Sequence, residues 1–217
     1  MDYTLYLVTD TGLSRGRLCT EVVDAAIRGG VTVVQYREKS ASTRRMIDEA
    51  RELRQLCRAA GVPFIVNDRV DVALAVDADG VHVGQDDMQA SLARKLIGKG
   101  RILGVSAGNV EEARRAEAEG ADYIGASPIF ATPTKPDAPA PLGVEGLRAM
   151  ARAVSIPVVA IGGINARNAA AIMAAGVAGV AVVSAIVSAA DIEAAARAIR
   201  AAALHSVHRD SGPSRKK

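Results

Sequence analysis

The stretch that decides the fold is VTVVQYREK, residues 31–39. Its first four residues are β-branched and uncharged, and Gly29 and Gly30 precede them. Because polar residues do not alternate with apolar ones, this run predicts a parallel strand buried on both faces. The strand ends in a polar cluster at the edge where α/β sheets and barrels bind ligands. A solvated surface charge run would look the same in this stretch alone. The residues after the other strands must therefore distinguish a ligand-binding cluster from an ordinary surface.

Short apolar runs alternate with helical patterns along the whole chain. In residues 42–60, for example, Met46, Ala50, Leu53, Leu56 and Cys57 recur at the spacing of one helical face. Eight such units predict a single-domain (β/α)8 TIM barrel over residues 1–204, with a doubly wound open sheet as the alternative. The expected strands are residues 4–8, 31–36, 63–66, 80–83, 102–105, 123–126, 157–161 and 179–183.

Composition and charge exclude several classes of protein. The chain has 217 residues, 49% of them hydrophobic, which suits one folded α/β domain. Its net charge of +3 comes from the last 13 residues, so the rest of the chain is electrically balanced. A nucleic-acid partner is therefore not expected. Residues 205–217 are predicted to form a basic disordered tail.

The two cysteines and the amino terminus indicate a cytoplasmic protein. Cys19 and Cys57 have neither metal-ligand nor CxxC spacing and fit buried free thiols. We find no cationic and apolar signal segment and no apolar run of ~18 residues, so no membrane association is expected.

Polar residues gather just after the expected strands, whereas the other strand ends carry mainly Gly, Pro and Asp. A barrel brings all carboxyl-terminal strand ends into one ring, so this asymmetry predicts a site on that face. The residues concerned are Gln35 to Lys39, Asn67, Asp68, Gln85, Asp86, Asp87, Ser106, Ser127, Gly162, Gly163 and Ser184.

Asp68 and Asp87 follow adjacent strands and suit a Mg²⁺ ion that keeps several waters and binds a phosphorylated substrate. Either residue alone would fit a helix cap better. Beside Arg37 and Lys39, the pair favours a metal and a diphosphate, since the cations and Mg²⁺ would together oppose the charge of a leaving group. Glu38 fits either an orienting or a solvated acid.

Two further segments suit phosphate. Thr132, Thr134 and Lys135 lie in a long proline-rich loop, where hydroxyls and an ammonium could hold an oxyanion. After the last two strands, Gly162 and Gly163 and then Ser184 stand where barrels build phosphate sites from backbone N–H groups. Two phosphate-binding regions suggest two phosphorylated small-molecule substrates.

No histidine is placed as a general base. His82 lies within an expected strand and fits a core histidine, and His205 and His208 lie in the tail. This placement disfavours hydrolases and proton-abstracting isomerases, and it favours chemistry driven by a metal-neutralised leaving group.

The chain resembles the thiamine-phosphate pyrophosphorylase (thiamine phosphate synthase) family over residues 3–186. The resemblance rests on six motifs in order: QYREK from Gln35, NDRVDVAL from Asn67, DGVHVGQDDM from Asp79, GVSA from Gly104, DYIGASPIFATPTK from Asp122 and AIGGI from Ala160. Tyr36 departs from the aliphatic residue expected there, and the basic tail is extra.

The resemblance implies a transferase. It would join 4-amino-2-methyl-5-(diphosphooxymethyl)pyrimidine to 4-methyl-5-(2-phosphooxyethyl)thiazole, through Mg²⁺-assisted diphosphate departure and a pyrimidinyl-methyl carbocation, giving thiamine phosphate and diphosphate. It assigns catalysis to Arg37, Lys39, Ser106 and Lys135, and these together with Gln35, Tyr36, Glu38 and Asn67 would hold the pyrimidine diphosphate. Thr132, Pro133, Thr134, Gly163, Val183 and Ser184 would hold the thiazole phosphate, and Asp68 and Asp87 would bind Mg²⁺.

Two alternatives remain open from the sequence. One is a thiazole tautomerase-like isomerase, which should lack the diphosphate and metal residues and carry a well-placed histidine. The other is a non-catalytic phosphate-binding barrel. The sequence also leaves open whether the chain forms a homodimer.

Overall fold

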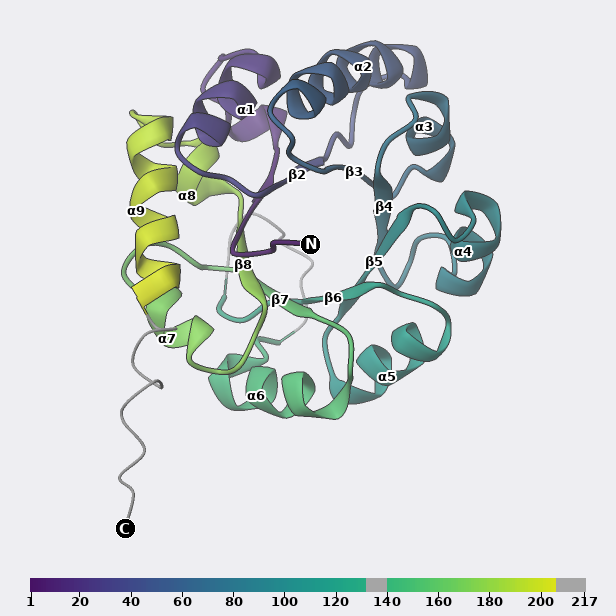
Figure 1. Cartoon of the computed structure of the whole chain (residues 1–217), viewed down its shortest axis with the longest axis vertical. Helices are drawn as coiled ribbons and strands as arrows, with labels where there is room; N and C mark the ends of the chain where they lie inside the picture. The colour runs from purple at the N-terminus through teal and green to yellow at the C-terminus, as the bar shows by residue number, and fades with distance from the viewer. Residues whose placement is uncertain (132–139, 206–217) are drawn as a thin grey trace.

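Eight parallel strands form a closed barrel in the computed structural model, which describes residues 1–131 and 140–205. Each strand pairs with its sequence neighbours, and β8 closes on β1 (Figure 1). The (β/α)8 TIM barrel is confirmed, and the open sheet is excluded because every described strand has two neighbours. The strands are β1 Leu5–Val8, β2 Val33–Tyr36, β3 Phe64–Asn67, β4 Gly80–Val83, β5 Ile102–Ala107, β6 Tyr123–Ala126, β7 Val158–Ile161 and β8 Gly179–Val182.

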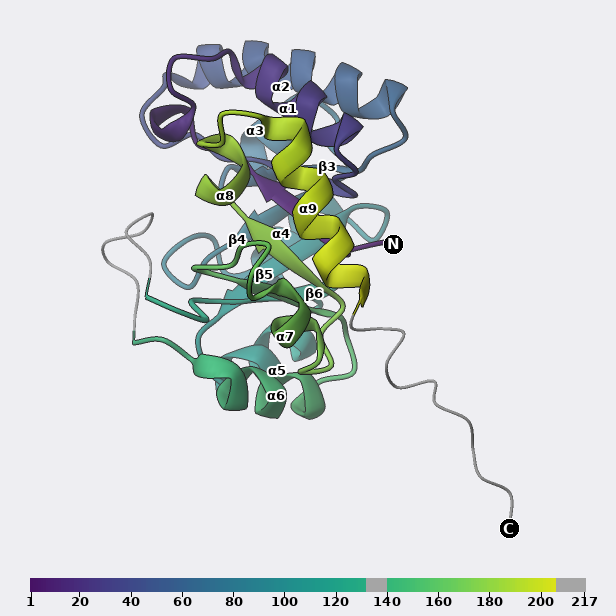
Figure 2. The same ribbon diagram turned by 90° about the vertical axis from the view of Figure 1, so that its left-hand side faces the viewer.

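Helices surround this barrel, and α9 completes the ring by packing beside α1 and α7 (Figures 1 and 2). No helix of the described residues is long and apolar enough to span a membrane. The residues predicted to form a disordered tail lie almost wholly outside the described residues. The helices are η1 Thr11–Leu13, α1 Cys19–Arg28, α2 Thr43–Ala59, α3 Val70–Ala75, α4 Ala90–Ile97, α5 Val110–Ala118, α6 Gly143–Ala153, α7 Ala169–Met173, α8 Ser184–Val187 and α9 Ile192–His205.

Most strand bounds agree with the sequence prediction, and two differences have a clear cause. β2 begins two residues later than expected, because the Thr32 hydroxyl accepts from the Leu5 N–H at 3.1 Å and donates to the Leu5 carbonyl at 3.0 Å. β5 runs two residues further than expected, so Ser106 lies inside the strand rather than after it. Ser106 is therefore held by the barrel ladder and not by a loop.

The predicted amphipathic helix at residues 42–60 is α2. Its buried residues are four of the five expected from the spacing, Met46, Ala50, Leu53 and Cys57, whereas Leu56 is only half-buried. The Ser42 hydroxyl accepts the Arg45 N–H and caps the first turn, where N–H groups lack partners within the helix. The helix therefore lies with one apolar face against the barrel.

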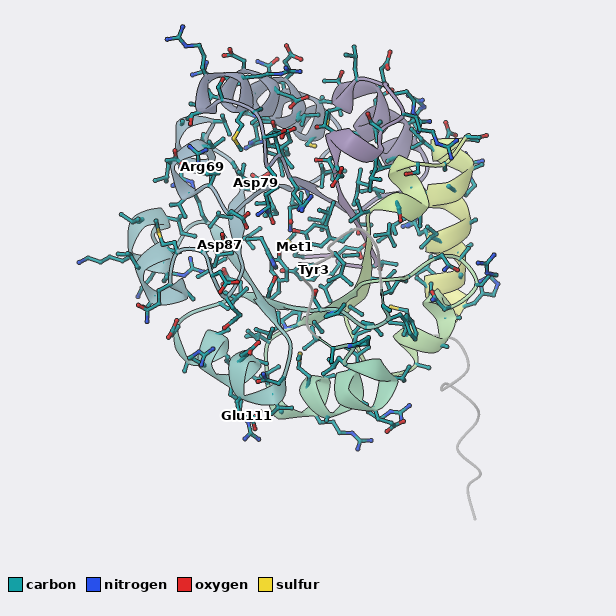
Figure 3. All side chains as sticks on the ribbon, turned by 180° about the vertical axis from the view of Figure 1, so that it is seen from behind. Met1, Tyr3, Arg69, Asp79, Asp87 and Glu111 are labelled. Atoms are coloured by element: carbon teal, nitrogen blue, oxygen red, sulfur yellow. The ribbon has the colours of Figure 1, made fainter. Side chains whose placement is uncertain are left out.

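The core has two layers. The larger layer fills the space between strands and helices, and a smaller one fills the barrel interior, where it contains Tyr3, Tyr6, Val33, Ile65, Tyr123 and Val159. Tyr3 lies within the ring of strands (Figure 3), and its backbone carbonyl lies against Gly179 at the start of β8. The amino-terminal segment therefore closes the barrel at the amino ends of its strands.

A glycine in β5 makes room for the aromatic residues of the interior. A Cβ at Gly104 would lie 2.2 Å from Tyr123 Cζ and 2.4 Å from His82 Nδ1. We expect Gly104→Ala to lower the free energy of unfolding by about 3 kcal/mol, because overpacking displaces both rings. Urea denaturation measures this change, with Gly100→Ala as the control because nothing lies within 4 Å of its Cβ position. Equal stability of the two variants would contradict this packing.

Candidate active site

A cavity of about 420 Å³ lies at the carboxyl ends of the strands. This is the face on which barrel enzymes hold their catalytic residues. The structure brings ten of the predicted site residues to its wall: Gln35, Arg37, Lys39, Asn67, Asp68, Asp87, Ser106, Gly163, Val183 and Ser184. The four predicted residues of the long loop, Thr132, Pro133, Thr134 and Lys135, lie outside the described residues.

The cation at the end of β2 is held in place by β1. Arg37 Nη1 donates to Asp10 Oδ2 at 2.7 Å, and the Arg37 backbone N–H donates to Thr9 Oγ1 at 3.0 Å. The guanidinium therefore has a fixed position at the cavity and keeps other N–H groups for a ligand. Sequence reasoning missed Asp10, although its position just after an expected strand was a usable signal.

The two predicted metal ligands lie side by side. Asp68 pairs with Lys39 Nζ across the cavity wall. Burial and the neighbouring Asp87 carboxylate raise the pKa of Asp68, while Lys39 opposes that rise. The Asp87 carboxylate is in turn held by the Gly84 N–H at 2.8 Å. Two carboxylates that repel one another in this way favour a bound cation, because the cation offsets the repulsion.

Neither aspartate caps a helix, which was the competing interpretation of the sequence. The residues that precede α3 and α4 are Arg69 and Gln89, and neither helix has a side-chain cap. Asp68 instead has a φ of 61°, in the left-handed region that costs free energy for residues other than glycine. Such strain is typical of a side chain aimed at a functional site.

The donor set suits Mg²⁺ better than a metal that needs a complete protein cage. Among the residues that the structure describes, no group of three or more His, Cys, Asp or Glu side chains could hold a metal ion. Two carboxylate ligands with room for water and phosphate oxygens fit the usual coordination of Mg²⁺ in phosphate enzymes. Asp68 and Asp87 could therefore hold the ion together with water and phosphate oxygens.

Strand alternation separates the predicted residues of β2. Gln35 faces the barrel interior and the cavity, whereas Tyr36 faces the helices and donates from its hydroxyl to Glu49 Oε2 at 2.6 Å. Glu38 also lies off the cavity wall, where it accepts from the Ser40 N–H at 2.7 Å and from Thr11 Oγ1 at 2.8 Å. The structure does not bring Tyr36 or Glu38 to the cavity.

Glu38 organises the segment that carries Lys39. Four donors surround its carboxylate: the N–H and hydroxyl of Ser40, the Ala41 N–H and the Thr11 hydroxyl. Partial burial alone would raise the pKa of Glu38, but these hydrogen bonds outweigh it and lower the pKa to about 2. The acid thus stays ionised and shapes the turn after β2.

Beneath the cavity lies a set of buried polar side chains that sequence reasoning did not connect. His82, expected as a core histidine, is buried but also lines the cavity, and its Nε2 lies 2.9 Å from Ser106 Oγ. Its Nδ1 lies 2.9 Å from the Tyr123 hydroxyl. Both ring nitrogens are engaged, so His82 is not a free base at the cavity.

Burial lowers the pKa of His82 to about 4, although Asp87 nearby opposes the shift. A histidine of the unfolded chain titrates near its ordinary pKa of about 6.5. Between these values the unfolded chain binds a proton that the folded chain does not, so the free energy of unfolding falls as the pH falls.

We therefore expect this histidine to cost the protein roughly 3 kcal/mol of stability between pH 7 and pH 4. Urea denaturation at both pH values should show that His82→Gln loses less stability than the unaltered chain. His205→Gln, at an exposed histidine of α9, serves as the control. An equal loss in all three proteins would contradict a neutral buried His82.

The opposite side of the cavity is made of backbone. Gly162 and Gly163 follow β7 with φ values of 111° and 69°, in the region that favours glycine. A Cβ at Gly163 would lie 2.8 Å from Phe130 Cβ, so the turn packs closely on the segment after β6. Gly163, Val183 and Ser184 line the same cavity as Arg37 and Lys39. One opening therefore holds both predicted phosphate regions.

The cavity at the carboxyl ends of the strands combines cations, paired carboxylates and exposed glycine backbone. This combination is typical of (β/α)8 enzymes that act on phosphorylated small molecules. Comparison with known proteins narrows the class. The family described as thiamine monophosphate synthase matches residues 5–186. The chain therefore belongs to the thiamine monophosphate synthase family.

Individual relatives agree along nearly the whole chain. A thiamine-phosphate synthase of Chloroflexus aurantiacus is 68% identical over 201 residues, which cover 93% of each chain. That of Moorella thermoacetica is 54% identical over 198 residues, 91% of this chain and 94% of the relative. A solved thiamine phosphate pyrophosphorylase from Pyrococcus furiosus superposes with a TM-score of 0.88 at 44% identity, covering 95% of this chain and 98% of that one.

Proposed function

We propose that this chain is a transferase that joins 4-amino-2-methyl-5-(diphosphooxymethyl)pyrimidine to 4-methyl-5-(2-phosphooxyethyl)thiazole, giving thiamine phosphate and diphosphate. The family and the high identity of its relatives support this reaction. The observation that carries it is one cavity lined by Arg37, Lys39, Asp68 and Asp87 together with the glycine turn after β7. Such a cavity suits two phosphorylated substrates.

Arg37 and Lys39 hold the diphosphate in this proposal. Asp10 occupies one nitrogen of the Arg37 guanidinium and fixes its plane, so the remaining N–H groups can donate to two phosphate oxygens. Lys39 adds an ammonium that pairs with Asp68 in the structure and would turn to the diphosphate when it binds. Lys135, which lies outside the described residues, is proposed to contribute a further cation, and Asn67 is proposed to donate at the edge of the cavity.

Asp68 and Asp87 are proposed to hold Mg²⁺. When bound, the ion neutralises charge on the diphosphate and so makes it a better leaving group. The side chains contribute by fixing two coordination sites next to the cations, while the Gly84 N–H keeps the Asp87 carboxylate in place. Glu38 supports this arrangement indirectly by shaping the turn that carries Lys39.

Departure of the diphosphate would leave a pyrimidinyl-methyl carbocation that the thiazole nitrogen captures. Among the described residues, His82 is the histidine that lines the cavity, and both of its ring nitrogens are hydrogen-bonded, so it is not free for proton abstraction. A cation route needs no general base, whereas a thiazole tautomerase would. Gly163, Val183 and Ser184, with Thr132, Pro133 and Thr134, are proposed to hold the thiazole phosphate.

Release of diphosphate tests this function directly. The full chain with both substrates and Mg²⁺ should form diphosphate and thiamine phosphate in equal amounts, and EDTA should abolish both. Excess Mg²⁺ should restore them. Isomerised thiazole phosphate without diphosphate would favour the tautomerase. Binding of both substrates without any product would leave a phosphate-binding barrel.

We also propose that the enzyme works in the reducing cytoplasm. Both cysteines of the chain are free thiols: Cys57 lies on the buried face of α2, and Cys19 is half-buried at the start of α1. Burial raises the pKa of each thiol to about 12, so neither is a reactive thiolate.

A further inference from the structure

A chain of four hydrogen bonds crosses the barrel interior beneath the cavity. Gln35 Nε2 donates to the Tyr6 hydroxyl at 2.9 Å, and the Tyr6 hydroxyl lies 2.7 Å from that of Tyr123. Tyr123 continues to His82 Nδ1 at 2.9 Å, and His82 Nε2 reaches Ser106 Oγ at 2.9 Å. These five side chains come from five different strands, and all of them line the cavity.

The number of hydrogens on each group decides which side chain donates in each of these four hydrogen bonds. Tyr6 accepts from Gln35, so its own hydrogen has one acceptor among the described residues, the Tyr123 oxygen. Tyr123 must then donate to His82 Nδ1, because that nitrogen is the remaining acceptor for the Tyr123 hydrogen among the described residues. A neutral imidazole that accepts at Nδ1 carries its proton on Nε2, which donates to Ser106 Oγ.

Running the bonds the other way would leave the Tyr6 hydrogen without an acceptor, unless the Gln35 amide also turned over. Tyr6 and Tyr123 are each 1% exposed, so a stranded hydroxyl hydrogen there would be costly. The five groups therefore have two self-consistent states, in which every bond points one way or every bond points the other. The observed Gln35 orientation selects the first.

We infer that Tyr6, Tyr123 and His82 are positioning residues that couple Gln35 to Ser106, so that Gln35 presents an acceptor to the cavity whenever Ser106 presents its hydroxyl hydrogen. In the observed state the Ser106 oxygen accepts from His82, and its hydrogen is left for a ligand. Gln35 Nε2 serves Tyr6, and its carbonyl oxygen, which has no partner among the described residues, is left likewise.

The inference rests on the proposed function for its ligand and deepens it. A 4-aminopyrimidine presents an amino donor next to a ring-nitrogen acceptor, which matches an acceptor on Gln35 and a donor on Ser106. The 4-oxo analogue presents the opposite pattern, a carbonyl acceptor next to an N–H donor. Binding of the 4-oxo analogue would require all four hydrogen bonds and the Gln35 amide to reverse together. The hydrogen-bonded side chains therefore select the amino form.

The tautomer of His82 is the first test, and it needs no substrate. Nitrogen-15 NMR of the full chain at pH 7.5 should show a neutral ring with its proton on Nε2, with the signal assigned by its loss in His82→Gln. A proton on Nδ1 would mean that Ser106 donates to His82, and it would overturn the proposed direction.

Selectivity is the second test. Calorimetry gives the dissociation constants of the 4-amino and 4-oxo pyrimidine diphosphates without turnover. In Tyr123→Phe the two ends of the chain can turn independently, so we expect the preference for the amino form to fall by about 10-fold, the value of one net hydrogen bond. Tyr3→Phe is the matched control, because Tyr3 packs on Tyr123 at 5.0 Å between ring centroids but lies outside the hydrogen-bonded chain.

An unchanged preference in Tyr123→Phe, or an equal fall in Tyr3→Phe, would overturn the coupling. If Tyr123→Phe does not fold, the tautomer of the unaltered chain still decides. Failure of the proposed function looks different: no thiamine phosphate would form, while the tautomer and the two dissociation constants would remain measurable. The two hypotheses can therefore fail separately.

Discussion

Replacing Asp87 by Asn should lower kcat by about 10³-fold at the Mg²⁺ concentration that saturates the unaltered enzyme, since one charged ligand of the ion is lost. The half-saturating Mg²⁺ concentration should rise by about 10-fold or more, because a neutral amide is the weaker ligand for a hard cation. Steady-state diphosphate release across a Mg²⁺ titration measures both quantities.

The fold should survive this change, because Asn can still accept the Gly84 N–H with its side-chain oxygen. Asp86→Asn is the matched control: Asp86 is the neighbouring residue, is exposed and does not line the cavity. A low kcat that no Mg²⁺ concentration changes, or an equal effect in Asp86→Asn, would count against Asp87 as a metal ligand. An unfolded product would instead mark the carboxylate as structural.

Ser106→Ala should lower kcat by about 10²-fold, the usual consequence of losing one donor that acts in the transition state. The removed hydroxyl is the end of the buried chain that faces the cavity, and His82 Nε2 loses its acceptor with it. Single-turnover kinetics separate the chemical step from substrate binding and therefore provide the appropriate measurement.

Ser155→Ala provides the control, since it deletes a hydroxyl that contacts Glu117 away from the cavity. If Ser106→Ala keeps the kcat of the unaltered enzyme, the hydroxyl has no part in the chemistry. If only KM rises, Ser106 binds the ground state and transition state equally.

Much of the fold and of the candidate site could be predicted because both follow from local patterns. Uncharged β-branched runs predicted the strands, and polar residues after them marked one face of the barrel. Asp68 and Asp87 follow neighbouring strands, so a closed parallel sheet had to bring them together. Their roles in binding Mg²⁺ remain predictions.

The remaining features depend on contacts that no local pattern encodes. Tyr36 is the exception: it belongs to a motif with Gln35 and Arg37, but strand alternation, which is itself a local pattern, turns it toward Glu49 and the helices. The bonds of Tyr6 with Tyr123 span 117 residues and become visible only when the barrel closes. For the same reason His82 was interpreted as an isolated core residue.

The amino-terminal segment that contains Tyr3 closes one end of the barrel, so the barrel interior is open at one end. Tyr3 fills the interior at the amino ends of the strands, so the cavity above Tyr6 opens only toward the loops. Two reactants cannot then approach from opposite ends, and both must enter and leave by the same opening. A molecule bound across this opening would therefore block the exchange of anything that lies beneath it.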